Sequence, residues 1–177
     1  MINISQTGAY NLDQAATKYN AEYVISITEK GGKAPPTPEG IDKDKHYVGY
    51  FDDYYKDVKF SAYRTPPTRE DIEKVLTFVK SIKNPRAELF IHCSAGISRS
   101  AALAIGIYYM LMGAREDKAE EAIMLALESH IGEKANFWPS NYIVEILDDI
   151  FGNKNRALSK KLAEFKSLAK PILAGKN

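Results

Sequence analysis

The spacing of apolar residues alternates along the chain between a strand-like and a helix-like period. Short apolar runs predict β-strands at residues 2–5, 22–28, 46–51 and 88–92. Apolar residues three and four positions apart predict helices at residues 10–19, 68–83, 116–129, 139–151 and 157–172. Residues 99–112 are apolar on every side, which predicts a helix buried at the centre of the fold.

Single residues mark the ends of several predicted elements. Thr68 is a good N-cap for the helix that follows it, and Gly113 is expected to end the buried helix. Pro139 is expected in the first turn of its helix, where a missing N–H does no harm. Residues 29–45 contain three Gly and three Pro among charged residues, so they predict an exposed loop.

The order of these elements predicts the fold class. Strands that alternate with helices favour a mainly parallel sheet, because parallel strands need crossover connections. We therefore predict one α/β domain, with a central sheet flanked by helices, for this chain of 177 residues. Ligands of such sheets bind beyond the carboxyl ends of the strands. Residues 29–45 and the segment after His92 are expected to overhang that same edge, where residues 29–45 would serve as a recognition loop.

Charge divides the chain into a body and a basic tail. Residues 152–177 carry seven Lys or Arg against one acid, Glu164, so the tail is +6 and the rest of the chain −5. We predict a folded domain over residues 1–152 and a basic C-terminal helix over residues 153–177. Docking of the helix on the domain is favoured over a membrane-surface or partner-binding role. The apolar stripe that would dock consists of Leu158, Leu162, Phe165, Ala169 and Ile172.

Composition indicates the cellular compartment and the classes of partner to expect. The only cysteine, Cys93, cannot form an internal disulfide, which favours a reducing compartment and the cytoplasm. The N-terminus lacks an apolar signal segment and the longest apolar run, residues 101–112, is too short for a bilayer, so no export or membrane span is expected. A net charge of +1 argues against nucleic acid as a general partner. These features leave the oligomeric state open.

The segment IHCSAGISRS, residues 91–100, stands where a strand ends and the buried helix begins. Cys93 faces the N–H groups of the following residues, which can converge on one anion as the chain wraps toward the helix N-terminus. Ser94, Ala95 and Gly96 are small enough for close backbone approach, and Gly96 allows the positive φ of a tight wrap. The predicted phosphate-binding residues are Ser94, Ala95, Gly96, Ile97, Ser98 and Arg99.

This loop predicts nucleophilic chemistry at sulfur. Its amides and the helix dipole stabilise a thiolate, so the pKa of Cys93 is expected in the range of about 3.5–7.5 of activated cysteines. Arg99 is spaced to hold two phosphoryl oxygens with its planar guanidinium during transfer of phosphorus to sulfur. Ser100 can donate a hydrogen bond to the sulfur as it leaves, and His92 is expected to fix loop carbonyls from behind. An inert buried thiol beside helix-capping residues is the alternative, which the strand–loop–helix context disfavours.

These residues carry a resemblance to a known family. His92, Cys93, Arg99 and Ser100 match HC-x5-R-[ST], so the chain resembles the protein tyrosine phosphatase superfamily. Its short length and Ser-Ala-Gly loop interior resemble the dual-specificity branch and the small bacterial and phage-type predicted tyrosine phosphatases. A looser likeness covers about residues 22–152. The resemblance implies the Cys-based phosphatase fold, a phosphocysteine intermediate, a phosphorylated protein as substrate and no cofactor.

A metal site is not expected. The three histidines, His46, His92 and His130, are scattered and lack the spacing of metal ligands.

The resemblance also implies a general acid, an aspartate on a mobile loop about thirty to forty residues before the cysteine. Asp52, Asp53 and Asp57 qualify. Asp57 has the most usual spacing, but the sequence Phe51-Asp52-Asp53 looks more like the related small phosphatases, where the second aspartate fits best. We select Asp53. Five of the eleven tyrosines lie close by and are expected to wall the cleft or to pack as ordinary aromatics: Tyr47, Tyr50, Tyr54, Tyr55 and Tyr63.

The predicted function is hydrolysis of phosphotyrosine in proteins, with phosphoserine and phosphothreonine as further substrates. Phosphoinositide phosphatases of the superfamily usually carry lysines inside the loop, and residues 94–98 have none. Two alternatives remain open: a phosphatase for a non-protein phosphate such as an RNA 5′ end, and a weakly catalytic module that binds phosphoproteins. The absence of a general acid would mark the latter.

Overall fold

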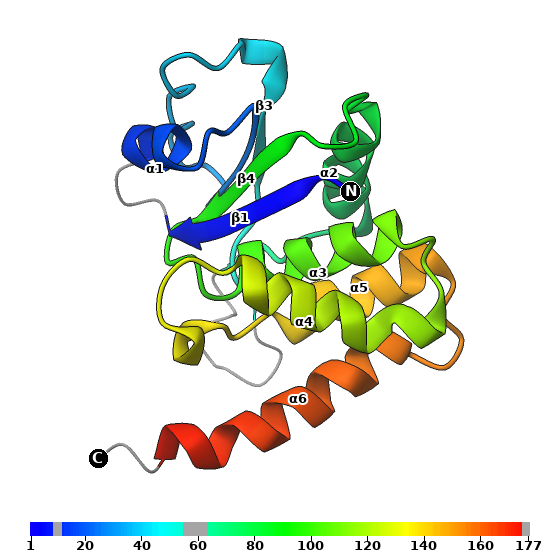
Figure 1. The fold of residues 1–177 in the computed structure, drawn as a ribbon. Helices are drawn as coiled ribbons and strands as arrows, with labels where there is room; N and C mark the ends of the chain where they lie inside the picture. The colour runs from blue at the N-terminus through cyan, green and yellow to red at the C-terminus, as the bar shows by residue number, and fades with distance from the viewer. Residues whose placement is uncertain (9–11, 55–63, 175–177) are drawn as a thin grey trace.

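A single parallel sheet forms the centre of the molecule (Figure 1), which is a computed structural model that describes residues 1–8, 12–54 and 64–174. The strands are β1 (Asn3–Gly8), β2 (Tyr23–Thr28), β3 (His46–Tyr50) and β4 (Glu88–Cys93). Their order in the sheet is β1-β4-β2-β3, and each neighbouring pair is parallel. The predicted strands and the predicted parallel α/β architecture are confirmed.

The two central strands are apolar because helices cover both of their faces. Leu89 and Ile91 of β4 point to the face that carries the large helical layer, and Phe90 points to the opposite face. There the ring of Tyr19, just after the first helix, stacks on Phe90 at 6.4 Å between centroids. Burial on both faces explains the nearly continuous hydrophobic run of residues 88–93.

The helices are α1 (Leu12–Lys18), α2 (Arg69–Ser81), α3 (Arg99–Leu111), α4 (Ala119–Ser129), α5 (Asn141–Phe151) and α6 (Ala157–Ala174). Short 3₁₀ turns occupy Lys43–Lys45, Glu116–Lys118 and Lys134–Asn136. In Figure 1, α3, α4 and α5 lie on one side of the sheet with α6 on their outer side, and α1 lies on the other side of the sheet. None of the helices in the described part of the chain is long and apolar enough to cross a bilayer.

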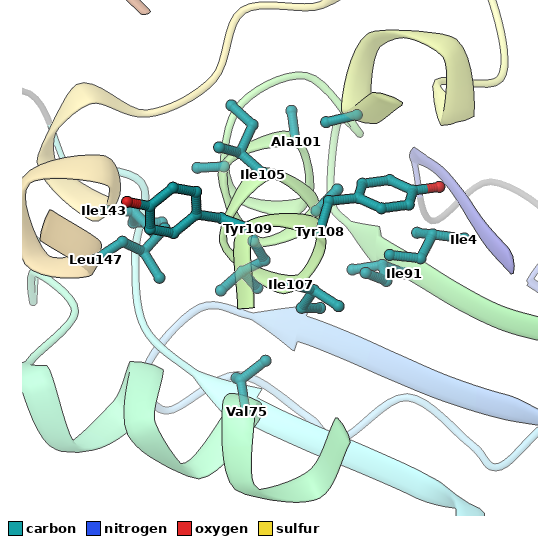
Figure 2. Packing of buried hydrophobic residues seen from close by; sticks show 14 of the residues in the cluster. Ile4, Val75, Ile91, Ala101, Ile105, Ile107, Tyr108, Tyr109, Ile143 and Leu147 are labelled. Carbon is teal, nitrogen blue, oxygen red and sulfur yellow. The ribbon is translucent and has the colours of Figure 1, made fainter. Parts of the chain in front are cut away.

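Helix α3 is the buried helix that the sequence predicts. Figure 2 shows its side chains pointing in all directions, toward β1, β4, α2 and α5. Ile105 and Ile107 are fully buried, and Tyr109 is buried with its hydroxyl donating to Asn153 Oδ1 at 2.9 Å. A Cβ on Gly106 would lie 2.5 Å from Leu147 of α5, so the small residue allows the two helices to approach closely.

Capping residues set the ends of two helices. Thr68 caps α2 as predicted, in a reciprocal capping box with Asp71. The prediction that Pro139 lies in the first turn of α5 is wrong. Ser140 is the N-cap, because its hydroxyl accepts a hydrogen bond from the Ile143 N–H at 3.4 Å, and Pro139 precedes the helix.

Helix α6 packs against α4 and α5. Leu158 and Leu162 are buried, and the ring of Phe165 meets Phe137 edge to face at 5.8 Å between centroids. Three residues of the predicted apolar stripe therefore contact the body of the molecule.

Candidate active site

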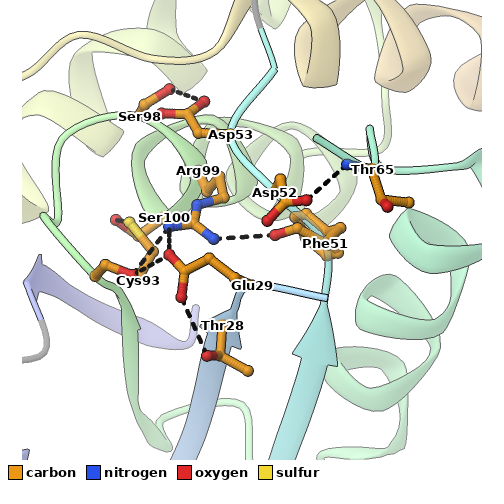
Figure 3. A network of polar contacts seen from close by, with 11 residues as sticks. Thr28, Glu29, Phe51, Asp52, Asp53, Thr65, Cys93, Ser98, Arg99 and Ser100 are labelled. Atoms are coloured by element: carbon orange, nitrogen blue, oxygen red, sulfur yellow. Dashed lines mark hydrogen bonds and ion pairs between the residues drawn. The ribbon is translucent and has the colours of Figure 1, made fainter. Parts of the chain in front are cut away.

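The loop that joins β4 to α3 holds the predicted nucleophile. Cys93 is the last residue of β4 and is 2% exposed. Its sulfur lies 3.4 Å from Ser100 Oγ, in the first turn of α3 (Figure 3). The Ser100 hydroxyl also donates to Gln6 Oε1 at 3.4 Å, which ties it to β1. The predicted pair of sulfur and hydroxyl is thus brought together.

Two glycines allow the loop to wrap tightly. Gly96 has φ of +71°, as the sequence predicts for this position. A Cβ at Gly96 would lie 2.0 Å from the backbone nitrogen of Gly8, so the loop rests directly on the end of β1. A Cβ at Gly8 would in turn approach the carbonyl oxygen of Ala95 to 3.0 Å. This second reason for glycine is not visible in the sequence, because it depends on a strand 85 residues or more away.

The guanidinium of Arg99 is fixed from two sides. Nη1 donates to the Phe51 carbonyl at 2.9 Å, and Nη2 donates to Glu29 Oε1 at 2.9 Å and to Ser94 Oγ at 3.0 Å. The residue is 4% exposed, and Nε is buried without a hydrogen-bond partner among the described residues. A buried donor of this kind is costly unless an acceptor reaches it, so the geometry suits an oxyanion that binds at Nε.

Glu29 is absent from the site that the sequence predicts, yet it reaches the loop. Its Oε1 accepts from Ser94 Oγ at 2.6 Å as well as from Arg99. These hydrogen bonds, that from Ser94 foremost, lower the pKa of Glu29 to about 2 despite partial burial. The sequence feature that could have indicated Glu29 is the expected parallel pairing of β2 with β4. This pairing places Ile27 beside Cys93, and therefore places Glu29, two residues later, beside the loop that follows Cys93.

The acid candidates have different partners. Asp53 Oδ1 accepts from Ser98 Oγ at 2.8 Å, so this carboxylate lies against the loop of residues 94–99, which is predicted to bind phosphate and is called the phosphate loop below. Asp52 Oδ2 accepts from the Thr65 N–H at 2.6 Å, and its own N–H donates to the Thr65 carbonyl at 2.9 Å. Asp52 therefore joins the segment directly after β3 to Thr65 through two hydrogen bonds. Asp57 lies outside the described residues.

His92 does not fix loop carbonyls, and that expectation is wrong for this structure. Its Nε2 lies 2.6 Å from Ser26 Oγ, and its Nδ1 has no partner among the described residues. Ser26 is the register partner of His92 on the neighbouring strand β2, so the His92 ring lies beside the Ser26 side chain and not beside the loop carbonyls. Burial, and then the charge of His46, lower the pKa of His92 to about 4. His92 is therefore neutral at neutral pH.

Two of the three histidines that look scattered in sequence meet at one hydroxyl. His46 Nε2 lies 2.7 Å from Ser26 Oγ, the same atom that contacts His92. The serine has one proton, so it can donate to only one of the two rings and accepts a hydrogen bond from at least one of them. In the part of the chain that is described, no three His, Cys, Asp or Glu side chains are grouped so that they could hold a metal ion.

The segment before α5 completes the surroundings of the loop. The Trp138 N–H donates to the Ile97 carbonyl at 3.1 Å, and the Ser140 N–H donates to the Ser98 carbonyl at 3.2 Å. Both bonds attach the turn at residues 138–141 to the outside of the phosphate loop.

Two of the five tyrosines make aromatic contacts with described residues. Tyr47 packs on Phe78 of α2 at 5.7 Å between ring centroids, a structural contact. Tyr54, next to the acid candidate Asp53, meets Tyr142 edge to face at 4.8 Å. Tyr55 and Tyr63 lie outside the described residues.

Comparison with protein families gives one match that covers most of the chain. A family model described as "Dual specificity phosphatase, catalytic domain" matches residues 8–145. The dual specificity protein phosphatase 1-A of Xenopus laevis is 31% identical over 77 residues, which are 44% of this chain and 20% of that protein. The matched stretch therefore spans about a fifth of the length of this curated relative.

Solved structures with the same fold are more distant in sequence. The PTP-2 phosphatase of Cydia pomonella superposes with a TM-score of 0.60 at 22% identity, over 83% of this chain and 84% of that one. The human tyrosine phosphatase-like serine/threonine/tyrosine-interacting protein superposes with a TM-score of 0.56 at 16% identity, over 82% and 85% of the two chains. At these identities the likeness concerns the fold alone.

Proposed function

Because this chain belongs to the dual specificity phosphatase catalytic-domain family, we propose that it hydrolyses phosphotyrosine in proteins, with phosphoserine and phosphothreonine as further substrates. The observation that carries the proposal is the buried guanidinium of Arg99, where the loop that begins at Cys93 meets α3. It is anchored on Phe51 and Glu29, and its buried Nε remains available to a phosphoryl oxygen.

In the first step the thiolate of Cys93 attacks phosphorus, and the bond from phosphorus to the substrate oxygen breaks. The electron pair of that bond stays on the leaving oxygen, which takes a proton from the carboxyl group of Asp53. The loop amides and Arg99 bind the oxygens of the phosphoryl group during transfer. The contact between Asp53 and Ser98 supports this role, because it holds the carboxyl group beside the loop.

In the second step a water molecule attacks phosphorus of the phosphocysteine and gives its proton to the carboxylate of Asp53. The bond from phosphorus to sulfur breaks, and the electron pair returns to sulfur as a thiolate. Ser100 Oγ lies 3.4 Å from that sulfur, and its single proton, which points to Gln6 Oε1 in this structure, can turn to the thiolate. Inorganic phosphate leaves, and the thiolate and the acid are restored.

The charges around the loop favour a phosphorylated protein over a polyanionic substrate. Residues 94–98 bring no cation, and Glu29 adds a carboxylate that contacts Ser94 and Arg99. An RNA 5′ end carries further phosphates, which this carboxylate would repel. A single phosphate on a peptide meets the anchored Arg99 without that penalty.

The test is turnover of peptides that carry phosphotyrosine, phosphoserine or phosphothreonine, beside RNA with a 5′ phosphate, each with and without a chelator. We expect the phosphotyrosine peptide to be hydrolysed fastest, chelator to have no effect and vanadate to inhibit competitively. Fastest turnover of RNA would contradict the proposed substrate. Binding of phosphopeptides without turnover would instead favour a phosphoprotein-binding module.

A further inference from the structure

Lys166, on the basic helix α6, is buried although it carries a charge: it is 9% exposed. Its Nζ donates to the Pro139 carbonyl at 2.6 Å and to Asn141 Oδ1 at 2.7 Å. The same ammonium lies 4.9 Å from the centre of the Trp138 ring. An ammonium has three N–H donors, and the two oxygen acceptors and the ring face together provide three partners for them. Lys166 thus binds the turn at residues 138–141.

That turn is attached to the phosphate loop. The N–H groups of Trp138 and Ser140 donate to the carbonyls of Ile97 and Ser98. In a trans peptide the C=O and the N–H point in opposite directions. Holding the Ile97 carbonyl outward therefore aims the N–H group of Ser98 into the loop. The Ser98 carbonyl, which also accepts the Ala102 N–H of α3 at 3.0 Å, aims the N–H group of Arg99 in the same way.

Charge links Lys166 to the acid candidate as well. Burial lowers the pKa of Lys166 to about 8, and the negative charge of Asp53 opposes this lowering. Asp53 itself rests on Ser98 of the loop. The ammonium thus feels the charge of the carboxylate that contacts Ser98, while its hydrogen bonds hold the turn that supports the same loop residue.

We propose that Lys166 is a positioning residue of the active site, which holds the turn at residues 138–141 against the phosphate loop and so aims the amides of Ser98 and Arg99. The proposal rests on the proposed phosphatase function. Lys166 lies beyond residue 145, where the family match ends. Helix α6 then supplies a positioning side chain to the active site from outside the matched region.

The test compares Lys166→Met with the matched control Lys160→Met, which changes an exposed lysine of the same helix. The measurements are kcat/KM for an aryl phosphate, the dissociation constant of tungstate and Tm. We expect Lys166→Met to lower kcat/KM and to weaken tungstate binding, each by about tenfold or more. The reason is that the loop amides take part in both catalysis and tungstate binding, and the substitution would misplace them. Lys160→Met should leave both unchanged.

The tungstate constant separates positioning from mere stability, because it is measured on folded molecules far below Tm. Equal constants for Lys166→Met and wild type, or equal losses in Lys160→Met, would overturn the proposal. If Lys166→Met does not fold, Asn141→Ala removes one acceptor of the ammonium and should weaken tungstate binding several-fold, and an unchanged constant would then overturn it. A wild-type protein that binds tungstate but hydrolyses no phosphopeptide would refute the proposed function and not the role of Lys166.

Discussion

Glu29 Oε1 lies 2.9 Å from Arg99 Nη2, so an ion pair joins the residue that follows β2 to the first residue of α3. The two side chains differ in exposure, 47% for Glu29 and 5% for Arg99. Glu29 thus contacts both ends of the loop, at Ser94 and at Arg99, while Arg99 Nε stays buried without a partner among the described residues. It connects the predicted recognition loop, residues 29–45, with the group that is proposed to bind phosphate.

Replacing Glu29 by Gln should change how stability depends on pH. The folded-state pKa of about 2 lies below the ordinary value of 4.5. The carboxylate therefore stabilises the fold fully above about pH 4.5, and the contribution is lost as the pH falls toward about 2. For a half-exposed group we expect at most about 1 kcal/mol. In urea unfolding, the difference between wild type and Glu29→Gln should shrink from pH 6 to pH 3, and a constant difference would contradict the ion pair.

Replacing Asp53 by Asn should affect substrates according to their leaving group. A phenoxide of high pKa needs a proton to leave, whereas an acidic phenol leaves unassisted. We expect hydrolysis of phosphotyrosine peptides to slow by about hundredfold, while an activated aryl phosphate is spared. Asp52→Asn should lack this selectivity and change Tm little, because the amide oxygen of Asn can still accept the hydrogen bond from the Thr65 N–H. If Asp57→Asn shows the selective pattern instead, the assignment of Asp53 is wrong.

Replacing Gly96 by Ala should be far more harmful than replacing Gly113, although both have positive φ, +71° and +84°. Alanine at Gly113 meets nothing within 4 Å and suffers only backbone strain of about 1–2 kcal/mol. Alanine at Gly96 collides with Gly8 at 2.0 Å, which adds an overpacking penalty of about 1–3 kcal/mol. Activity should be lost only in Gly96→Ala. Equal Tm losses in the two variants would show that the loop does not rest on β1.

Replacing Arg99 by Lys tests geometry at constant charge. Lysine cannot contact Phe51, Glu29 and a phosphoryl oxygen together, because it lacks the planar fork of arginine. We expect kcat/KM to fall by about hundredfold or more and tungstate binding to weaken in parallel. An effect of only a few-fold would indicate that charge alone suffices at this position.

The sequence predicts well the features that are local in the chain. The Thr68 cap, the buried helix at α3 and the positive φ of Gly96 each depend on neighbouring residues, and the structure agrees with them. The parallel sheet follows from the alternation of elements. The predicted start of α5 at Pro139 is wrong because the neighbouring Ser140 is the better N-cap.

The sequence places residues 29–45 near the loop, but the individual side chains that contact the loop depend on the tertiary fold. Glu29 looks like one charge in an exposed loop, and it reaches Arg99 because β2 and β4 are neighbours. Lys166 looks like one of many lysines on a basic helix until the packing of α6 buries it. His92 turns to Ser26, since the register of two strands and not the motif sets its partner.

The most direct measurement is acid quench during turnover of a phosphotyrosine peptide labelled in its phosphate, followed by mapping of the label on the protein. If Cys93 is the nucleophile, the label appears on the peptide fragment that contains Cys93, at a thiol-linked phosphate. Cys93→Ser should fold normally, carry no label and show no turnover, because an unactivated hydroxyl does not replace a thiolate. Retained turnover in Cys93→Ser, or label at another residue, would contradict the proposed mechanism.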